Sequence, residues 1–207
     1  MSDEDLEDAS DLARLAYLVS AIGVANVLTL ALMYAIEVPR GGPYPIGTVN
    51  DVTGGIYNLA VIPLLLALSR GDGSAGSQLL TRATVLSSVL GSASSFLLVA
   101  KVLPFVPSAV VSTIAISVQT GWMLRFGLRR HPSGRYPSGL LRLARLIGEG
   151  TLAGLPFAAL GAAFPPKSRP RVVGFGVAAV VGGAAWVAVP AFWFLLGRAL
   201  SRPGASR

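Results

Sequence analysis

Long stretches without a charged residue are the feature that most limits what this chain can fold into. Residues 15–36 and 172–197 carry no Asp, Glu, Lys or Arg over 22 and 26 positions. A helix rises about 1.5 Å per residue, so about 20 residues cross the roughly 30 Å hydrocarbon core of a bilayer. Charged residues make up 13% of the chain, whereas soluble domains carry about 25%. The sequence therefore predicts an integral membrane protein.

Four further stretches qualify as spans, at residues 52–69, 83–100, 102–124 and 147–164. We predict the all-α integral membrane class, with one bundle of six transmembrane helices. An acidic tail at 1–12 precedes this domain of residues 13–198, and a basic tail at 199–207 follows it. The expected spans cover residues 14–37, 48–69, 80–103, 107–127, 146–164 and 172–197.

Two places decide the number of spans. Pro104 and Pro107 are expected to form a turn between the third and fourth spans, because proline interrupts a helix. In the fifth segment Glu149 leaves only 15 uncharged residues after it, which is short for a crossing. Five spans plus a re-entrant segment is therefore the alternative.

The basic residues predict the orientation. With six spans, 12 of the 17 Lys and Arg residues lie on the side of the N-terminus, and basic loops stay in the cytoplasm. We expect a plasma-membrane protein with both termini cytoplasmic. The loop from Arg125 to Arg145 holds six bases and no acid, so it is expected to lie on anionic lipid headgroups. Nucleic acid is not an expected partner, because the bases separate apolar runs.

Several chemistries are excluded by missing residues. The chain has no Cys, and its one His, His131, lies in a polar loop. No phosphate-binding loop and no pair of carboxylates at helical spacing occurs in a span. We therefore expect no enzyme, cofactor or metal, and a lipid-modifying enzyme ranks third among the functions considered.

Uncharged polar side chains fall near the middle of several predicted spans. Asn26, Asn58 and Gln119 lie at similar depth, as do three serines of the third span: Ser92, Ser94 and Ser95. One interpretation is a binding site for a small polar solute or ion, because transporters place such sites near the midplane. The other is hydrogen bonding that only holds helices together.

Asp51 lies about one turn inside the outer boundary of the membrane, the side opposite the termini. It shares a helical face with Asn58. It is a candidate carboxylate for coupling to an ion or proton. Alternatively it forms a structural ion pair with Lys101 or Arg40. These two bases and Glu37 lie at span ends on the same outer level. We expect these three residues to form an outer ion cluster.

Glu149 is the remaining candidate, at the cytoplasmic start of the fifth span. Arg145 precedes it by four residues, so an intrahelical ion pair explains it without a function. The alternative is a cytoplasmic gate, with Glu149 and Asp51 at opposite ends of one path.

Small and aromatic residues carry packing signals. Small residues at intervals of four are expected to bring helices close together or to form a homodimer face: Ala83, Ser87, Gly91 and Ser95, and Gly150, Gly154, Ala158 and Ala162. Trp122 and Trp193 are expected at the membrane interface, and Trp186 in the core.

Two functions of different class follow. The first is a bundle that transports or senses a small solute or ion through the polar side chains above. The second is a non-catalytic scaffold, or a subunit that associates with its own copies or with a partner subunit.

Overall fold

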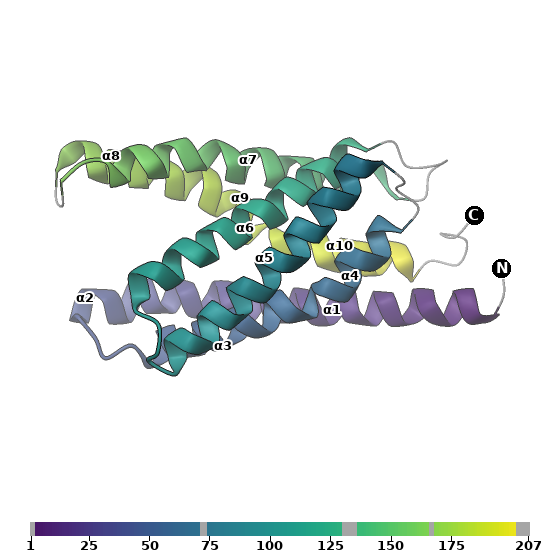
Figure 1. The fold of residues 1–207 in the computed structure, drawn as a ribbon, viewed down its shortest axis with the longest axis horizontal. Helices are drawn as coiled ribbons and strands as arrows, with labels where there is room; N and C mark the ends of the chain where they lie inside the picture. The colour runs from purple at the N-terminus through teal and green to yellow at the C-terminus, as the bar shows by residue number, and fades with distance from the viewer. Residues whose placement is uncertain (1–2, 71–73, 130–135, 166–167, 202–207) are drawn as a thin grey trace.

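The computed structural model describes residues 3–70, 74–129, 136–165 and 168–201. Within these ranges the chain is helical and contains no strand. Six segments are long and apolar enough to cross a membrane, which confirms the predicted all-α bundle of six long apolar helices. They are Ala9–Arg40, Pro45–Ser69, Ala75–Val99, Phe105–Leu128, Ser138–Ala162 and Arg169–Leu200. Asp3 and Ser201 lie at one end of the bundle, here the terminal end, and the other end is the distal end (Figure 1).

Three of the six segments are built from shorter helical elements. The first consists of α1 (Asp3–Leu32), a π-helical turn η1 (Met33–Glu37) and α2 (Val38–Arg40). The second consists of α3 (Pro45–Ala60) and α4 (Ile62–Ser69). The next three are α5 (Ala75–Val99), α6 (Phe105–Leu128) and α7 (Ser138–Ala162). The last contains α8 (Arg169–Ala178), a π-helical turn η2 (Ala179–Gly183), α9 (Ala184–Val187) and α10 (Val189–Leu200).

Proline explains two of these divisions. Pro63 and Pro190 have no N–H to donate to the carbonyl four residues earlier, so the helix is interrupted just before each of them. The helices on either side of each interruption still belong to one long apolar segment. The hydroxyl of Ser20 donates to the carbonyl of Pro190 at 2.8 Å, which ties α1 to the start of α10.

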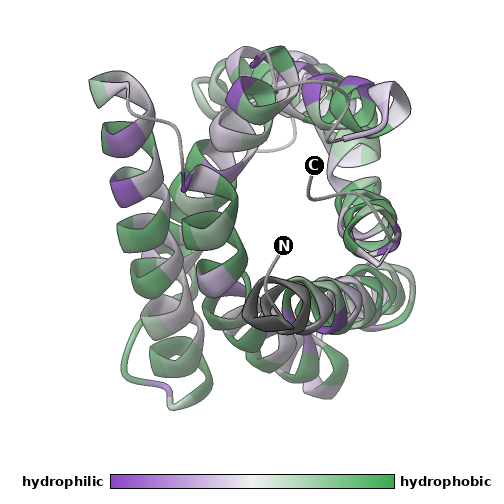
Figure 2. Ribbon diagram, turned by 90° about the vertical axis from the view of Figure 1, so that its right-hand side faces the viewer, coloured by the Kyte–Doolittle hydropathy of each residue, from purple (hydrophilic) through white to green (hydrophobic). Residues whose placement is uncertain are grey.

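The six segments pack in a closed circuit in chain order. Each segment packs against the next: α1 against α3, α3 against α5, α5 against α6, α6 against α7, and α7 against α8. The last segment changes neighbours along its length, because α8, η2 and α9 pack against α7 while α10 packs against α1. Figure 2, seen from the terminal end, shows the helices arranged around a centre. At the distal end α8 and α2 lie on opposite edges of the bundle (Figure 1).

The apolar core fills only the terminal half of the bundle. Phe192 touches Phe126 and Trp193, with ring centroids 5.8 and 4.9 Å away. Trp193 in turn donates from Nε1 to the Tyr57 hydroxyl at 2.8 Å. The other buried members of this core come from α1, α4 and its junction with α3, α6, α7 and α10, and from Tyr136 just before α7: Ala16, Val19, Val61, Leu64, Leu65, Leu68, Trp122, Met123, Tyr136, Leu140, Ala144, Ile147, Val189, Leu196 and Ala199. Burial of these side chains closes the bundle at its terminal end.

The prediction for the two tryptophans is wrong. Trp122 and Trp193 are 4% and 1% exposed and belong to the core, rather than to an interfacial belt. Their indole N–H groups find partners inside the bundle, Ser69 at 3.3 Å and Tyr57 at 2.8 Å. A satisfied N–H lets the large ring pack in the interior.

Two predicted polar segments are partly helical. α1 begins at Asp3, so the predicted acidic tail is helical from Asp3 onward. α6 continues to Leu128 and α7 starts at Ser138, so Arg125, Arg142 and Arg145 lie on helices instead of in a loop. Arg favours helices and its long side chain reaches water from within one, so these bases are accommodated near the helix ends. His131 lies outside the described residues.

Two further details of the helices differ from expectation. Pro104 caps α6, whereas Pro107 lies within its first turn, where a missing N–H costs nothing. The fifth segment is a helix of 25 residues that starts nine positions before Ile147. It is therefore as long as its neighbours, and the described residues contain no re-entrant turn at 147–162.

The small-residue stripes bring helix backbones together inside the chain. A Cβ placed on Gly154 of α7 would lie 3.0 Å from the Cα of Gly182 in η2. One placed on Gly91 of α5 would lie 3.1 Å from the Cβ of Ala115 in α6. These glycines therefore serve contacts between neighbouring segments.

Candidate functional site

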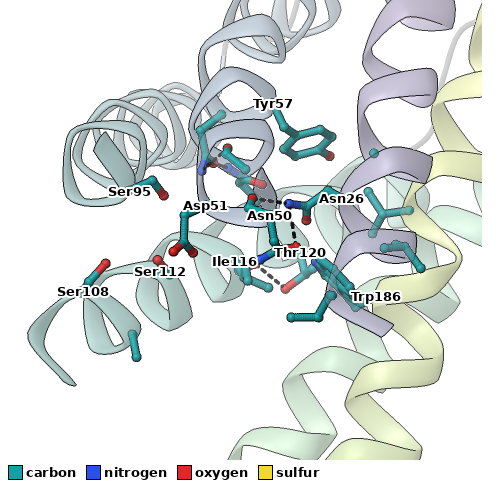
Figure 3. A pocket seen from close by; sticks show the side chains of 18 of the residues that line it. Asn26, Asn50, Asp51, Tyr57, Ser95, Ser108, Ser112, Ile116, Thr120 and Trp186 are labelled. Carbon is teal, nitrogen blue, oxygen red and sulfur yellow. Dashed lines mark hydrogen bonds between the residues drawn. The ribbon is translucent and has the colours of Figure 1, made fainter. Parts of the chain in front are cut away.

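A cavity of about 220 Å³ lies among α1, α3, α5, α6 and the break between α9 and α10. It extends from Phe105, the exposed first residue of α6, to Met123, which belongs to the apolar core. The cavity therefore reaches the distal end and stops at the core. Its polar lining, part of which Figure 3 labels, comprises Asn26, Asn50, Asp51, Tyr57, Asn58, Ser95, Ser108, Ser112, Gln119 and Thr120.

Four of the five residues predicted to form a polar path line this one cavity. Asn26 comes from α1, Asp51 and Asn58 from α3, and Gln119 from α6. They converge because the polar residues of each helix share one face, and that face is turned toward the inside of the bundle. Glu149, the fifth, does not line the cavity.

Asn58, Ser88 and Gln119 form a hydrogen-bonded group across three helices, here called the amide cluster. Nε2 of Gln119 donates to Oδ1 of Asn58 at 2.6 Å and to the hydroxyl of Ser88 at 3.0 Å. Asn58 donates to the carbonyl of Gly54 at 3.0 Å, and Ser88 to that of Thr84 at 2.8 Å. This cluster joins α3, α5 and α6 at mid-height.

Asn26 joins α1 to α3 in a similar way. Its Nδ2 donates to the carbonyl and the Oδ1 of Asn50 at 2.8 and 3.1 Å, and lies 3.2 Å from the Thr53 hydroxyl. Thr29 also donates to Oδ1 of Asn50 at 3.2 Å. The side chain of Asn26 thus holds two helices together while it lines the cavity.

Asp51 differs from these amides because it has no partner among the described residues. It is half-buried, lines the cavity, and makes no hydrogen bond or ion pair with any other residue that the structure describes. In Figure 3 its carboxylate points into the cavity on the side of Ser112 and Ser95. The expected ion pair with Lys101 or Arg40 is not formed, and both of those side chains are exposed.

Glu37 is likewise not part of an ion cluster in the described residues. It is 5% exposed and accepts hydrogen bonds from the N–H groups of Ile46 and Gly47 at 2.7 and 2.9 Å. These are among the first N–H groups of α3, which have no partner within the helix. Glu37 therefore caps α3, and its charge also interacts favourably with the positive end of the helix dipole.

Glu149 forms the intrahelical pair that its spacing predicts. Its Oε1 accepts from Nε of Arg145 at 2.6 Å, and the two side chains are 43% and 54% exposed. Such an exposed pair contributes little to stability. Its position outside the cavity gives no support to a path between Glu149 and Asp51.

Ser112 and Tyr57 line the cavity but were not singled out from the sequence. For Ser112 a signal exists, because Ser108, Ser112 and Gln119 share one face of α6 at helical spacing. Tyr57 accepts from Trp193, and nothing in the sequence indicates that contact.

The lining of the cavity holds one acidic residue, Asp51, and no basic residue. In the described part of the chain, no three or more His, Cys, Asp or Glu side chains gather where they would hold a metal ion. No protein-family model, no curated protein and no solved structure shows significant similarity to the chain.

Proposed function

We propose that the chain transports or senses a small polar solute or ion that binds in the cavity. The supporting observation is that polar side chains from four segments line one space, and that the only charged group among them, Asp51, has no partner in the described residues. An unpaired carboxylate within a span is costly unless water or a ligand reaches it.

In this proposal the protein lies in the plasma membrane with both termini in the cytoplasm. The bias of basic residues toward the terminal end supports that orientation. The distal end then faces outward, so the cavity receives its solute from outside, and the apolar core separates it from the cytoplasm. Arg125, Arg142 and Arg145 would contact anionic headgroups of the inner leaflet, at about 1 kcal/mol for each base.

The absence of cysteine from the chain makes a direct test possible. Ser112→Cys places one thiol in the cavity, and Ser117→Cys places one on the same helix outside it. A charged, membrane-impermeant thiol reagent added from outside should label Ser112→Cys and leave Ser117→Cys unmodified. If Ser112→Cys reacts only from the cytoplasmic side, or not at all, the outward-facing cavity is refuted.

Native mass spectrometry of the purified protein then tests for the solute itself. A small molecule retained by the natural protein and lost from Asp51→Asn would support transport or sensing. If Asp51→Asn retains the same molecule and carries full flux in proteoliposomes, a coupling role for Asp51 is excluded.

A scaffold or subunit role is the second candidate. It is favoured by the amide cluster and by Asn26, whose amide N–H groups are occupied by contacts between helices. Under this function Asp51→Asn would change thermal stability only, and a retained partner subunit or second copy would replace the small molecule in the mass spectrum.

A further inference from the structure

The register of three helices defines a second group of side chains beside the amide cluster. α3 and α6 run from the distal to the terminal end, and α5 runs the opposite way. Seven residues are close to two helical turns, or about 10.5 Å. Moving seven residues toward the distal end from Asn58, Gln119 and Ser88 leads to Asp51, Ser112 and Ser95.

These three residues, here called the acceptor cluster, share one level and line the same cavity. Each lies on the same helical face as its counterpart in the amide cluster, since seven residues turn a helix through almost two full rotations. Asp51, Ser95 and Ser112 therefore face one another across the cavity from three different helices.

The two groups differ in their hydrogen bonds. The amide N–H groups and the Ser88 hydroxyl of the amide cluster have protein partners. Asp51, Ser95 and Ser112 have none within the described part of the chain. Ser95 is only 7% exposed, yet its oxygen is not enclosed by protein, so it opens into the cavity. The neighbouring Ser108 cannot take its place, because its hydroxyl is paired with Ser94 at 3.0 Å.

The charge and geometry of the acceptor cluster identify what it would bind. A single carboxylate without a basic neighbour favours a ligand with one positive charge. A primary ammonium group has three N–H donors, which matches three acceptor side chains on three helices. A divalent cation takes about six or more oxygen ligands, whereas two hydroxyls and one carboxylate offer fewer.

The size of the cavity limits the rest of the ligand. Its 220 Å³ corresponds to about seven water molecules at about 30 Å³ each. Leu98 and Ala109, each three residues from Ser95 or Ser112 along its helix, also line the cavity, as does Leu30, and they form the apolar wall. A short hydrocarbon chain therefore fits next to the ammonium group.

We propose that the acceptor cluster binds the primary ammonium group of a small amine, with its hydrocarbon part against the apolar wall. This inference rests on the proposed function, because it names the class of solute that the cavity takes. The amide cluster, in contrast, holds the helices in place and does not contact the ammonium group.

Calorimetric titration of the full chain in detergent micelles, in an amine-free buffer, tests the proposal. The probe is n-butylammonium, and the controls are tetramethylammonium, which has the same charge but no N–H, and 1-butanol, which has no charge. We expect n-butylammonium to bind at least tenfold more tightly than either control. Asp51→Asn should weaken it roughly tenfold to hundredfold and Ser112→Ala roughly two- to tenfold, from the strengths of charged and neutral hydrogen bonds. Ser117→Ala, outside the cavity, should stay within about twofold.

Other outcomes overturn the proposal in distinct ways. Equal binding of tetramethylammonium shows that charge alone is recognised, and displacement of the amine by millimolar Na⁺ indicates an alkali-ion site. If no amine binds while Ser112→Cys is labelled from outside, this inference fails and the proposed function stands; if neither occurs, both fail. Should Asp51→Asn not fold, Ser112→Ala and Ser95→Ala carry the test, and unchanged affinity in both refutes the acceptor cluster.

Discussion

Replacing Gln119 by leucine tests whether the amide cluster holds the bundle together. Gln119 is 8% exposed and donates to Asn58 at 2.6 Å and to Ser88 at 3.0 Å. Leucine has a similar volume, so the substitution removes both hydrogen bonds while leaving little empty space. Asn58 and Ser88 keep their own bonds to backbone carbonyls on α3 and α5.

The expected loss follows from those two bonds. Hydrogen bonds between transmembrane helices contribute about 0.6 to 2 kcal/mol each. Gln119→Leu should therefore lower the free energy of unfolding by about 1 to 4 kcal/mol. Asn58→Leu removes one of the same bonds, so the double variant should lose less than the sum of the two single variants, by about 0.6 to 2 kcal/mol.

Reversible unfolding in mixed micelles, followed by tryptophan fluorescence, measures this cycle. Ser117→Ala is the control, because Ser117 bonds only to the carbonyl of Thr113 on its own helix. Losses that add to within about 0.5 kcal/mol would refute the coupling between Asn58 and Gln119. A fall of more than about tenfold in n-butylammonium affinity for Gln119→Leu would refute the separation of the two clusters.

Two further predictions concern packing and capping, and the same unfolding assay measures both. Gly148→Ala would drive a Cβ into Leu124 and should lower the free energy of unfolding by about 1 to 3 kcal/mol. The control Gly121→Ala meets no neighbour within 4 Å and should be neutral or stabilising. Equal effects of the two substitutions would contradict the close packing of α6 and α7. Glu37→Gln should lower the free energy of unfolding by about 1 kcal/mol, because a neutral amide caps α3 less well. Glu149→Gln, which breaks an exposed ion pair, should lower it by about 0.5 kcal/mol or less. The reverse order of the two effects would contradict the capping role of Glu37.

The number and class of helices could be predicted because the physical cause is local. A charge in hydrocarbon is costly, so the absence of charge over about 20 residues marks a span without knowledge of its neighbours. The face shared by Asp51 and Asn58 was also predictable, because it depends only on their spacing of seven in one helix.

The partners of these residues depended on contacts that the sequence does not encode locally. Glu37 and Arg40 are close in sequence, yet Glu37 binds backbone N–H groups of α3, which every residue type except proline offers and no pattern marks. The position of Trp193 near a span end predicts an interfacial residue, whereas its bond to Tyr57 on another helix cannot be read from the sequence. α7 begins eight residues before the predicted span for a related reason, since Arg142 and Arg145 lie within the helix and their long side chains reach water.

The last segment changes neighbours part-way along its length. α8 and α9 pack against α7, whereas α10 packs mainly against α1, so a shift of α7 relative to α1 would bend the segment at residues 187–190. Trp186 precedes this point and Pro190 ends it, and both line the cavity. A molecule seated against both side chains would resist that bend, and occupancy of the cavity would thereby be linked to the position of α7 relative to α1.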